Sequence, residues 1–277
     1  MISSKRLEKR NLQDIYDQLL RQLKDTKALV RANAVEKLAK IDHPSVVSRL
    51  VDALSDSNPL VRWSAALVLG EREEKEAVGP LISELSDHFS EVRMYAAEAL
   101  GILLQDEEKC PPALIKNLKD PDELVRIEVA ESIGAIGDQK ALPALWKVIH
   151  DRSPLVRSYV AVAIGRLGSR ADITRLEREM RNEKNDTVKI GYYQALYILG
   201  KHEILPAILK LLESRDYRVR CATARTLCSD FIVDRSNVQV ILDTLQQAFK
   251  RETSVAIAPK SSIQSSIREI KQRFPGK

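Results

Sequence analysis

Apolar and small side chains recur along the chain in short stripes that are spaced like one face of an α-helix. One stripe consists of Val125, Val129, Ala130 and Ile133. A second stripe begins beside Pro143 and consists of Leu142, Leu145, Val148 and Ile149. Proline suits the first turn of a helix, where its missing N–H has no partner to lose. The pattern therefore predicts pairs of helices, here called helix A for the first member and helix B for the second.

The dipeptide Val-Arg marks helix A and recurs at a nearly constant interval. It occurs at Val30-Arg31, Val61-Arg62, Val92-Arg93, Val125-Arg126, Val156-Arg157 and Val219-Arg220, and Val188-Lys189 fills the one gap. Successive valines lie 31, 31, 33, 31, 32 and 31 residues apart. A fixed period in this range is typical of stacked helical repeats rather than of one globular core. The sequence therefore predicts an all-α solenoid.

Glycines occupy two further fixed places in the repeat. Nine positions after the repeat valine stand Gly70, Gly101, Gly134 and Gly165. Glycine inside a helix costs about 1 kcal/mol relative to alanine, so its repeated use predicts close backbone approach between neighbouring A helices. Twelve positions after the valine stand Gly137, Gly168 and Gly200. These are predicted to follow a helix end in left-handed geometry.

Acidic and basic residues also recur in register. Five residues before the valine stand Asp25, Asp56, Asp87, Asp120 and Asp151, and six residues after each Asp stand Arg31, Arg62, Arg93, Arg126 and Arg157. Such an Asp can satisfy free N–H groups where helix A starts. The Arg is placed to pair with an Asp of its own or of the adjacent unit. We interpret the set as a structural Asp–Arg ladder, the alternative being a row of arginines that binds a ligand.

The pattern Asp-x4-Val-Arg-x3-Ala-x3-Leu-Gly resembles the HEAT repeat, in the short bacterial form also seen in phycobilisome lyases. The resemblance covers roughly residues 11–273 and implies a right-handed superhelix of about seven helix pairs with irregular terminal helices. We expect one solenoid over 1–277, with a leading helix in 11–24, seven repeats over 25–251, and a closing helix and tail over 252–277. The ends match less well, since the sixth unit has Glu183 and Lys189 in place of Asp and Arg.

The composition is that of a soluble folded protein with an aliphatic core. Hydrophobic residues make up 44%, charged residues 30% and aromatic residues only 5% of the chain. No signal peptide or membrane-spanning run is apparent in the sequence, so no membrane partner is expected. Cys110, Cys221 and Cys228 are odd in number and form no Cys-x-x-Cys pair. Reduced thiols and a cytoplasmic location are expected.

The net charge of +5 conceals an asymmetry along the chain. Residues 151–277 carry 23 Lys and Arg against 14 Asp and Glu, a net charge of +9. Residues 1–150 carry 21 against 25, a net charge of −4. The carboxyl-terminal half should therefore attract anions.

The resemblance to HEAT superhelices implies that B helices line an inner, concave face. Two positions of helix B, four and one before the Asp that ends each unit, point away from the core leucines. From the third helix pair to the sixth, the residues at these two positions are almost wholly basic. Trp146 lies beside them and is either an exposed aromatic anchor or packed between repeats. Together these residues are here called the basic strip: Lys116, Lys119, Trp146, Lys147, His150, Arg178, Arg181 and Lys210. Either this strip binds an acidic partner, or its charges only solvate the helices and complement their dipoles.

Residues for catalysis or metal binding are not apparent. His43, His88, His150 and His202 lie in different repeats without metal-ligand spacing. HEAT-type deoxyhypusine hydroxylases need several His-Glu pairs, and this chain has only His202-Glu203. No nucleophile elbow or glycine-rich phosphate loop occurs either. We therefore expect no cofactor, no metal and no catalytic residue.

Three functions remain open at this point. The first is a non-catalytic scaffold that binds an acidic segment of another protein on the basic strip. The second is a nucleic-acid binder, since the strip resembles the basic inner face of the HEAT-like alkylpurine DNA glycosylases. The third is a phycobilin lyase or phycobiliprotein chaperone, suggested only by the repeat subtype. The first is the function we favour, and the oligomeric state is not predicted.

Overall fold

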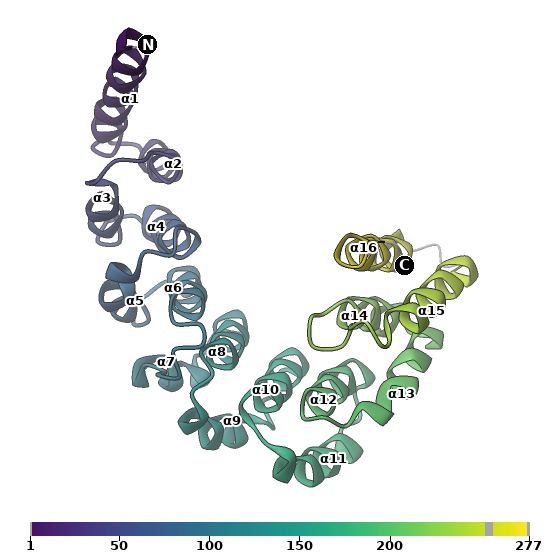
Figure 1. Ribbon diagram of the computed structural model, residues 1–277. Helices are drawn as coiled ribbons and strands as arrows, with labels where there is room; N and C mark the ends of the chain where they lie inside the picture. Colours follow the sequence, from purple (N-terminus) through teal and green to yellow (C-terminus); the bar gives the residue numbers. More distant parts are fainter. Residues whose placement is uncertain (1, 253–256, 276–277) are drawn as a thin grey trace. The chain divides into compact units, whose positions relative to one another are not determined.

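The computed structural model describes residues 2–252 and 257–275, and these residues form helices and connecting turns without any strand (Figure 1). They divide into two units, residues 1–141 and 142–277. The first unit contains α1 (Ile2–Gln22), α2 (Ala28–Leu38), α3 (Val46–Ala53), α4 (Pro59–Glu71), α5 (Val78–Glu84), α6 (Ser90–Leu103), α7 (Pro112–Lys116) and α8 (Glu123–Ile136). The second contains α9 (Leu142–Val148), α10 (Pro154–Leu167), α11 (Ile173–Asn182), α12 (Asp186–Ile198), α13 (Leu205–Lys210), α14 (Tyr217–Leu227), α15 (Val238–Arg251) and α16 (Ile257–Arg273).

Short 3-10 turns precede or extend many of the B helices. They are η1 (Lys75–Ala77), η2 (Asn117–Lys119), η3 (Gln139–Ala141), η4 (Arg170–Asp172), η5 (His202–Ile204) and η6 (Leu211–Glu213). The prediction of an all-helical repeat fold is confirmed. The expectation of one continuous solenoid over the whole chain stays a prediction.

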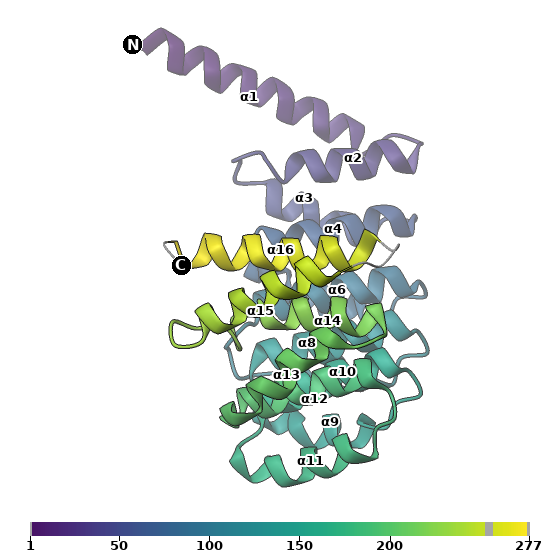
Figure 2. The same ribbon diagram turned by 90° about the vertical axis from the view of Figure 1, so that its right-hand side faces the viewer.

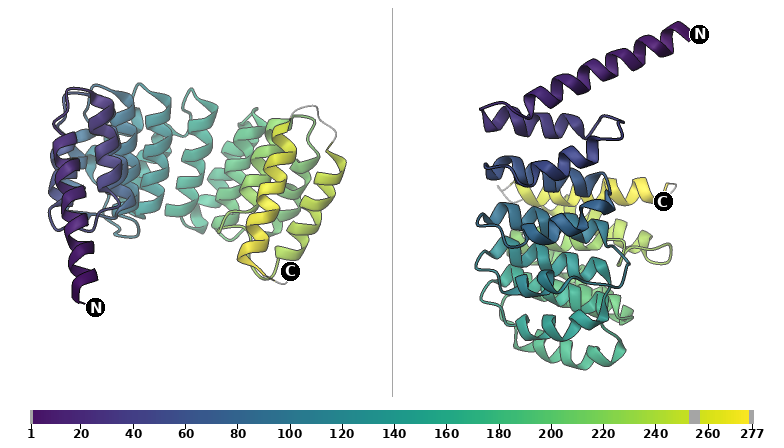
Figure 3. Two further views of the ribbon diagram at one scale, coloured as in Figure 1. Left: turned by 90° about the horizontal axis from the view of Figure 1, so that it is seen from above. Right: turned by 90° about the vertical axis from the view of Figure 1, so that its left-hand side faces the viewer.

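Each unit consists of two rows of helices. The even-numbered helices, α2 to α8 in the first unit and α10 to α16 in the second, are the predicted A helices with the closing helix and form the A row. The odd-numbered helices from α3 to α7 and from α9 to α15 form the B row. Seen from above, the successive helices of each unit lie side by side (Figure 3, left).

The A helices begin where a side chain takes over the free N–H groups of the first turn. Asn58, Asp122 and Ser153 each precede a helix and accept hydrogen bonds from N–H groups two or three residues further on. The recurring Asp lies two residues earlier than these caps. Asp56, for example, accepts a hydrogen bond from the Asn58 N–H at 2.8 Å. The prediction that this Asp caps helix A directly is therefore wrong, because it orders the turn that leads into the cap.

Consecutive helices of the A row pack backbone to backbone, as their glycines predict. A Cβ atom on Gly70 would lie 2.9 Å from the Cα atom of Ala99, and one on Gly165 would lie 2.6 Å from the Cα atom of Ala195. Gly101 faces Ser132 in the same way. Consecutive B helices make far fewer backbone contacts. The A row is consequently the tighter of the two rows.

This difference in spacing decides on which side each unit bends. A stack of wedge-shaped helix pairs curves toward its tighter row, because a small rotation accumulates from one repeat to the next. In the second unit, α10, α12, α14 and α16 lie on the inside of the bend and α9, α11, α13 and α15 on the outside (Figure 1). In this unit the expectation that B helices line the concave face is wrong, because the smallest residues lie on the A helices.

The recurring arginines join each repeat to the next. Arg31 binds both carboxylate oxygens of Asp56 at 2.7 Å, and its Nη1 atom donates to the backbone oxygen of Asp25 at 2.8 Å. The Arg62–Asp87 and Arg93–Asp120 pairs repeat this geometry. The arginine thus holds the carboxylate of the following repeat and the backbone of its own.

In the second unit glutamates replace the aspartates of this ladder. Arg157 pairs with Glu183 at 2.7 Å and donates to the backbone oxygen of Asp151 at 2.9 Å. Arg220 pairs with Glu252, also at 2.7 Å. The remaining predicted member, Arg126, donates to the backbone oxygen of Asp120 at 2.8 Å. The longer glutamate side chain therefore serves the same contact where the repeat departs from its consensus.

Helix ends and chain ends depart from prediction in two places. Gly137 and Gly200 follow helix ends with φ of 82° and 92°, as predicted, whereas Gly168 has φ of −76° and is extended. The leading helix α1 begins at Ile2 rather than near residue 11, and it extends beyond α2 (Figure 2). The expected closing helix is α16, which packs against α14 and α15, where Ile263 and Ile270 are fully buried. It completes the A row of the second unit.

We predict that Gly70→Ala destabilises the protein, although alanine is the better helix former. The added methyl group would lie against the backbone of α6 and should lower the free energy of unfolding by about 1–3 kcal/mol. Gly79→Ala in α5 is the control, because a Cβ atom there meets nothing within 4 Å. It should be neutral or gain up to about 1 kcal/mol. Urea denaturation of both variants measures the difference, and equal effects would contradict tight packing of the A row.

We predict that Arg93→Met is far more damaging than loss of an exposed arginine. It leaves the carboxylate of Asp120, which is only 6% exposed, without its guanidinium partner, at a cost of about 3 kcal/mol. The control is Arg49→Met, since the Arg49–Asp52 pair is exposed and should contribute less than about 0.5 kcal/mol. The free energies of unfolding in urea test this. If the two variants were equally stable, the ladder would have no structural role.

Candidate functional surfaces

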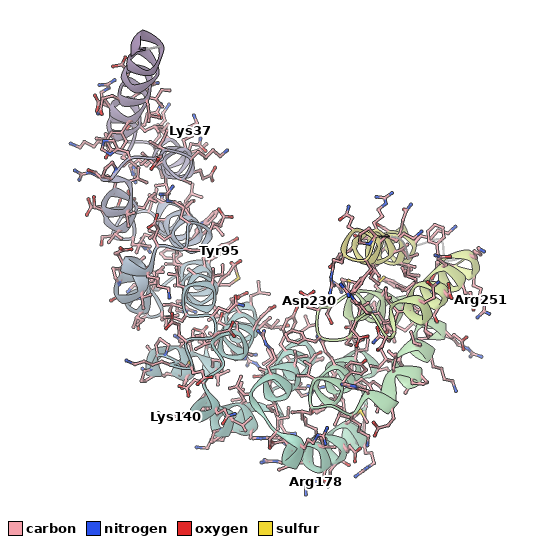
Figure 4. All side chains as sticks on the ribbon, in the orientation of Figure 1. Lys37, Tyr95, Lys140, Arg178, Asp230 and Arg251 are labelled. Atoms are coloured by element: carbon pink, nitrogen blue, oxygen red, sulfur yellow. The ribbon has the colours of Figure 1, made fainter. Side chains whose placement is uncertain are left out.

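The structure distributes the residues of the predicted basic strip over both units. Lys116 and Lys119 end the α7–η2 segment of the first unit, and both are exposed. The other members belong to the second unit. The basic residues among these, together with Arg175, are exposed on the B helices α9 to α13 or at their ends and are here called the basic ridge: Lys147, His150, Arg175, Arg178, Arg181 and Lys210. Because these helices belong to the B row, the ridge lies on the outer side of the second unit, as the position of Arg178 illustrates (Figure 4).

Trp146 is not the exposed anchor that the sequence suggested. Its side chain is 9% exposed, and the guanidinium carbon of Arg175 lies 3.9 Å from the centre of its ring. A tryptophan at this position fills the space between α9 and α11, and the stacked arginine covers what remains. Arg175 could have been found from the sequence, because it precedes Arg178 by three residues and so lies on the same face of α11.

One carboxylate lies beneath the cations of the basic ridge. Glu179 is largely buried, and its oxygens lie 3.5 Å from Nε2 of His150 and 3.7 Å from Nη2 of Arg178. The side chains of His150 and Arg178 remain 75% and 65% exposed. Within the described part of the chain, Lys147, Arg181 and Lys210 have no carboxylate at ion-pair distance. The ridge therefore keeps most of its positive charge available to solvent.

A second distinctive surface lies on the A row of the first unit and was not predicted. The rings of Trp63 and Tyr95 stack with their centres 5.0 Å apart, joining α4 to α6. Tyr95 lies on the A-row side of this unit (Figure 4). Beside it, α6 and α8 enclose a groove of about 260 Å³, here called the acidic groove, lined by Glu98, Gly101, Ile102, Gln105, Glu128, Glu131, Ser132 and Ala135.

Burial and neighbouring carboxylates raise the pKa of two glutamates in the acidic groove. Burial, followed by the charges of Glu131 and Glu98, raises the pKa of Glu128 to about 7. Burial and the charges of Glu131 and Glu71 also raise the pKa of Glu98. Like charges held close together in a partly desolvated site disfavour ionisation of each group. The sequence contains a signal for this groove, since its glutamates lie three or six positions after the repeat valine, on one face of helix A.

Other kinds of site are not found in the described residues. No three side chains of His, Cys, Asp or Glu in residues 2–252 and 257–275 are placed to hold a metal ion. None of the helices that the structure describes is long and apolar enough to cross a membrane. The three cysteines are free thiols and buried.

Family models match most of the repeats found above. A model of HEAT repeats matches residues 16–101 and 111–197, and a model of the single HEAT repeat matches residues 204–229. Together these ranges cover more than half of the chain. The chain belongs to the HEAT-repeat family.

Solved structures of other helical-repeat proteins share this HEAT fold. One is a chain of the complex of CpcE and CpcF of phycocyanin lyase from a Nostoc species, with 22% sequence identity, a TM-score of 0.58, and coverage of 81% of this chain and 94% of that one. Another is the protein YibA of Escherichia coli, with 20% identity, a TM-score of 0.50, and coverage of 96% and 97%. No curated protein sequence matches. At these identities the likeness shows the HEAT fold alone.

We predict that Glu128→Gln stabilises this HEAT protein in a pH-dependent way. Because the pKa of Glu128 is raised above its value in an unfolded chain, about 4.3, the folded state binds the proton more tightly. Its ionisation therefore costs stability progressively as the pH rises from about 4.5 to about 7. Allowing for partial exposure, the substitution should add roughly 1–2 kcal/mol at pH 8 and little near pH 4.5.

Thermal melting across this pH range measures the effect. The matched variant Glu76→Gln removes an exposed carboxylate from the same unit and should leave the melting temperature unchanged at every pH. A stabilisation by Glu128→Gln that does not vary with pH would show that Glu128 ionises normally.

Proposed function

We propose that this protein is a non-catalytic scaffold that binds an acidic segment of another protein on the basic ridge. The observation that supports this most directly is the register of exposed basic side chains on successive B helices, beneath which lies the carboxylate of Glu179. Rigid helices hold these charges at intervals of roughly 10 Å, the usual distance between packed helices. An extended acidic chain could meet them one after another without ordering the scaffold, which keeps the entropic cost of binding low.

Comparison between repeats supports a role beyond solvation. Two residues after the fully buried core residue of each B helix, Lys147, Arg178 and Lys210 correspond to Asp52 and Ser83 in earlier repeats. The same helix position is therefore compatible with an acidic or neutral residue. Complementing the helix dipole would favour a cation in every repeat alike.

The similar chain from Nostoc gives independent support for a protein partner. That structure is a complex of two proteins, CpcE and CpcF. A duplex cradled on a concave basic face receives less support, because the ridge is on the outer side of the second unit. For this reason we favour a protein segment over nucleic acid.

Charge reversal on the ridge tests the proposal. The test variant carries Lys147→Glu, Arg178→Glu, Arg181→Glu and Lys210→Glu, and the control carries Lys37→Glu, Lys40→Glu, Lys109→Glu and Lys140→Glu. All eight lysines and arginines are exposed, so the two variants undergo the same charge change on different surfaces. Fluorescence anisotropy with a labelled Glu-rich peptide should show at least about tenfold weaker binding to the test variant, and less than about twofold change in the control.

Duplex DNA serves as the competing ligand in the same assay. Five phosphate contacts would make the logarithm of the association constant fall with a slope of about −4 against the logarithm of salt concentration. If the duplex bound more tightly than the peptide with such a slope, and the test variant abolished it, the ridge would be assigned to nucleic acid. If the peptide bound both variants equally well, the basic ridge would not be a binding surface.

A further inference from the structure

The acidic groove of the first unit combines features that its role in the fold does not explain. Gly101 allows Ser132 of α8 to lie directly against α6, where its hydroxyl donates to the backbone oxygen of Ala97 at 2.9 Å. The rim of the groove includes Ile102, a large apolar residue that is 40% exposed. The groove thus lies where α6 and α8 pack closely together.

Two carboxylates of the groove, those of Glu98 and Glu128, have no cation beside them in the described residues. Neither Glu98 nor Glu128 has a Lys or Arg at ion-pair distance, and the nearest polar contact of Glu128 is the Ser132 hydroxyl at 3.5 Å. A partly buried carboxylate without a cation is costly to ionise, and this cost is relieved either by protonation, as the raised pKa of Glu128 reflects, or by a cation that a partner supplies.

Equivalent positions in other repeats show that the HEAT fold does not need these carboxylates. The position of Glu128 is occupied by Tyr95 and Tyr159 in the flanking repeats. The position of Glu98 is occupied by Leu67 and Val162. The A row therefore accepts apolar residues at both places, so that the glutamates are not required for packing.

The residues that line the groove favour a basic side chain over a metal ion as the cation that binds there. No three carboxylates of the described chain are placed to ligate a metal ion. A Lys or Arg side chain has the length to reach between two separated carboxylates while its aliphatic part covers Ile102. The adjoining Trp63–Tyr95 stack offers aromatic faces that bind cations and apolar side chains.

From these observations we infer that the A-row face of the first unit, from Trp63 to Glu131, is a docking surface for a basic segment of another protein. One Lys or Arg of that segment lies between Glu98 and Glu128, and an apolar or second basic side chain packs on Trp63 and Tyr95. This surface is separate from the basic ridge in residues and in sign of charge. It would stand even if the ridge bound nothing.

The test uses the full chain and a labelled 15-residue peptide of Lys and Leu, arranged so that the lysines lie on one face of an α-helix and the leucines on the other. We expect the peptide to bind, and we expect Glu98→Gln with Glu128→Gln to weaken binding at least tenfold. The control pair Glu73→Gln with Glu76→Gln removes two exposed carboxylates from the same unit and should change affinity less than twofold. Circular dichroism and melting curves establish that both variants are folded.

Two further measurements identify the groove as the site. Binding of a cation favours the ionised carboxylate, so affinity for the peptide should rise severalfold from pH 6 to pH 8, and this dependence should vanish in the groove variant. Trp63→Ala should weaken binding severalfold without altering the pH dependence, because it removes only the aromatic contact.

Three outcomes would overturn the inference. The peptide could fail to bind at low salt, or the groove variant could bind it as tightly as the control pair does. Sedimentation velocity supplies the third: if the unmodified chain self-associates and the groove variant alone is monomeric, the occupant is a second copy of this chain rather than a separate basic partner.

Discussion

Close approach between successive A helices is the constraint on which the rest of the structure depends. Gly70 against Ala99 and Gly165 against Ala195 leave no room for a methyl group. Dispersion contacts at such short range are individually small, but they add up along the full length of two helices. The same contacts shorten the A row relative to the B row. They thereby decide which helices form the inner surface of a unit and which side chains face a partner from there.

The arginine ladder has a different role, which is to keep neighbouring repeats in register. Helix packing alone allows sliding, since alanine and leucine ridges repeat every few residues. A bidentate contact such as Arg93 with Asp120 allows one position only, because a planar guanidinium and a planar carboxylate must meet edge to edge. The further bond from each arginine to the backbone of its own repeat makes the position depend on both repeats. Apolar packing thus holds neighbouring repeats together, and the arginine ladder fixes how they are aligned along each other.

Much of this fold could be predicted from sequence because a repeat protein states its pattern several times. The period of the Val-Arg dipeptide indicated the helix pairs, and the glycines nine residues later indicated tight packing. What failed was the choice of inner row, which came from the family resemblance and not from these glycines. The burial of Trp146 could not be predicted from the repeat pattern either, since a tryptophan next to an exposed lysine can point toward solvent or pack between repeats. Its burial depends on Arg175 from the following helix pair, a contact between residues almost thirty apart.

Repeats also provide an internal comparison that a single globular domain lacks. Where one helix position is apolar in some units and charged in others, the fold cannot be the reason for the charge. The argument applies to Glu98 and Glu128 on the A row, whose positions are apolar in other repeats. On the B row, Lys147 and Arg178 correspond to an acidic or a neutral residue in earlier repeats, so the fold does not require a cation there either. Because the two surfaces carry charge of opposite sign, the net charge of +5 describes neither of them. A partner approaching either surface meets the local field of a few aligned side chains, and it is this field, rather than the charge of the whole chain, that would steer association.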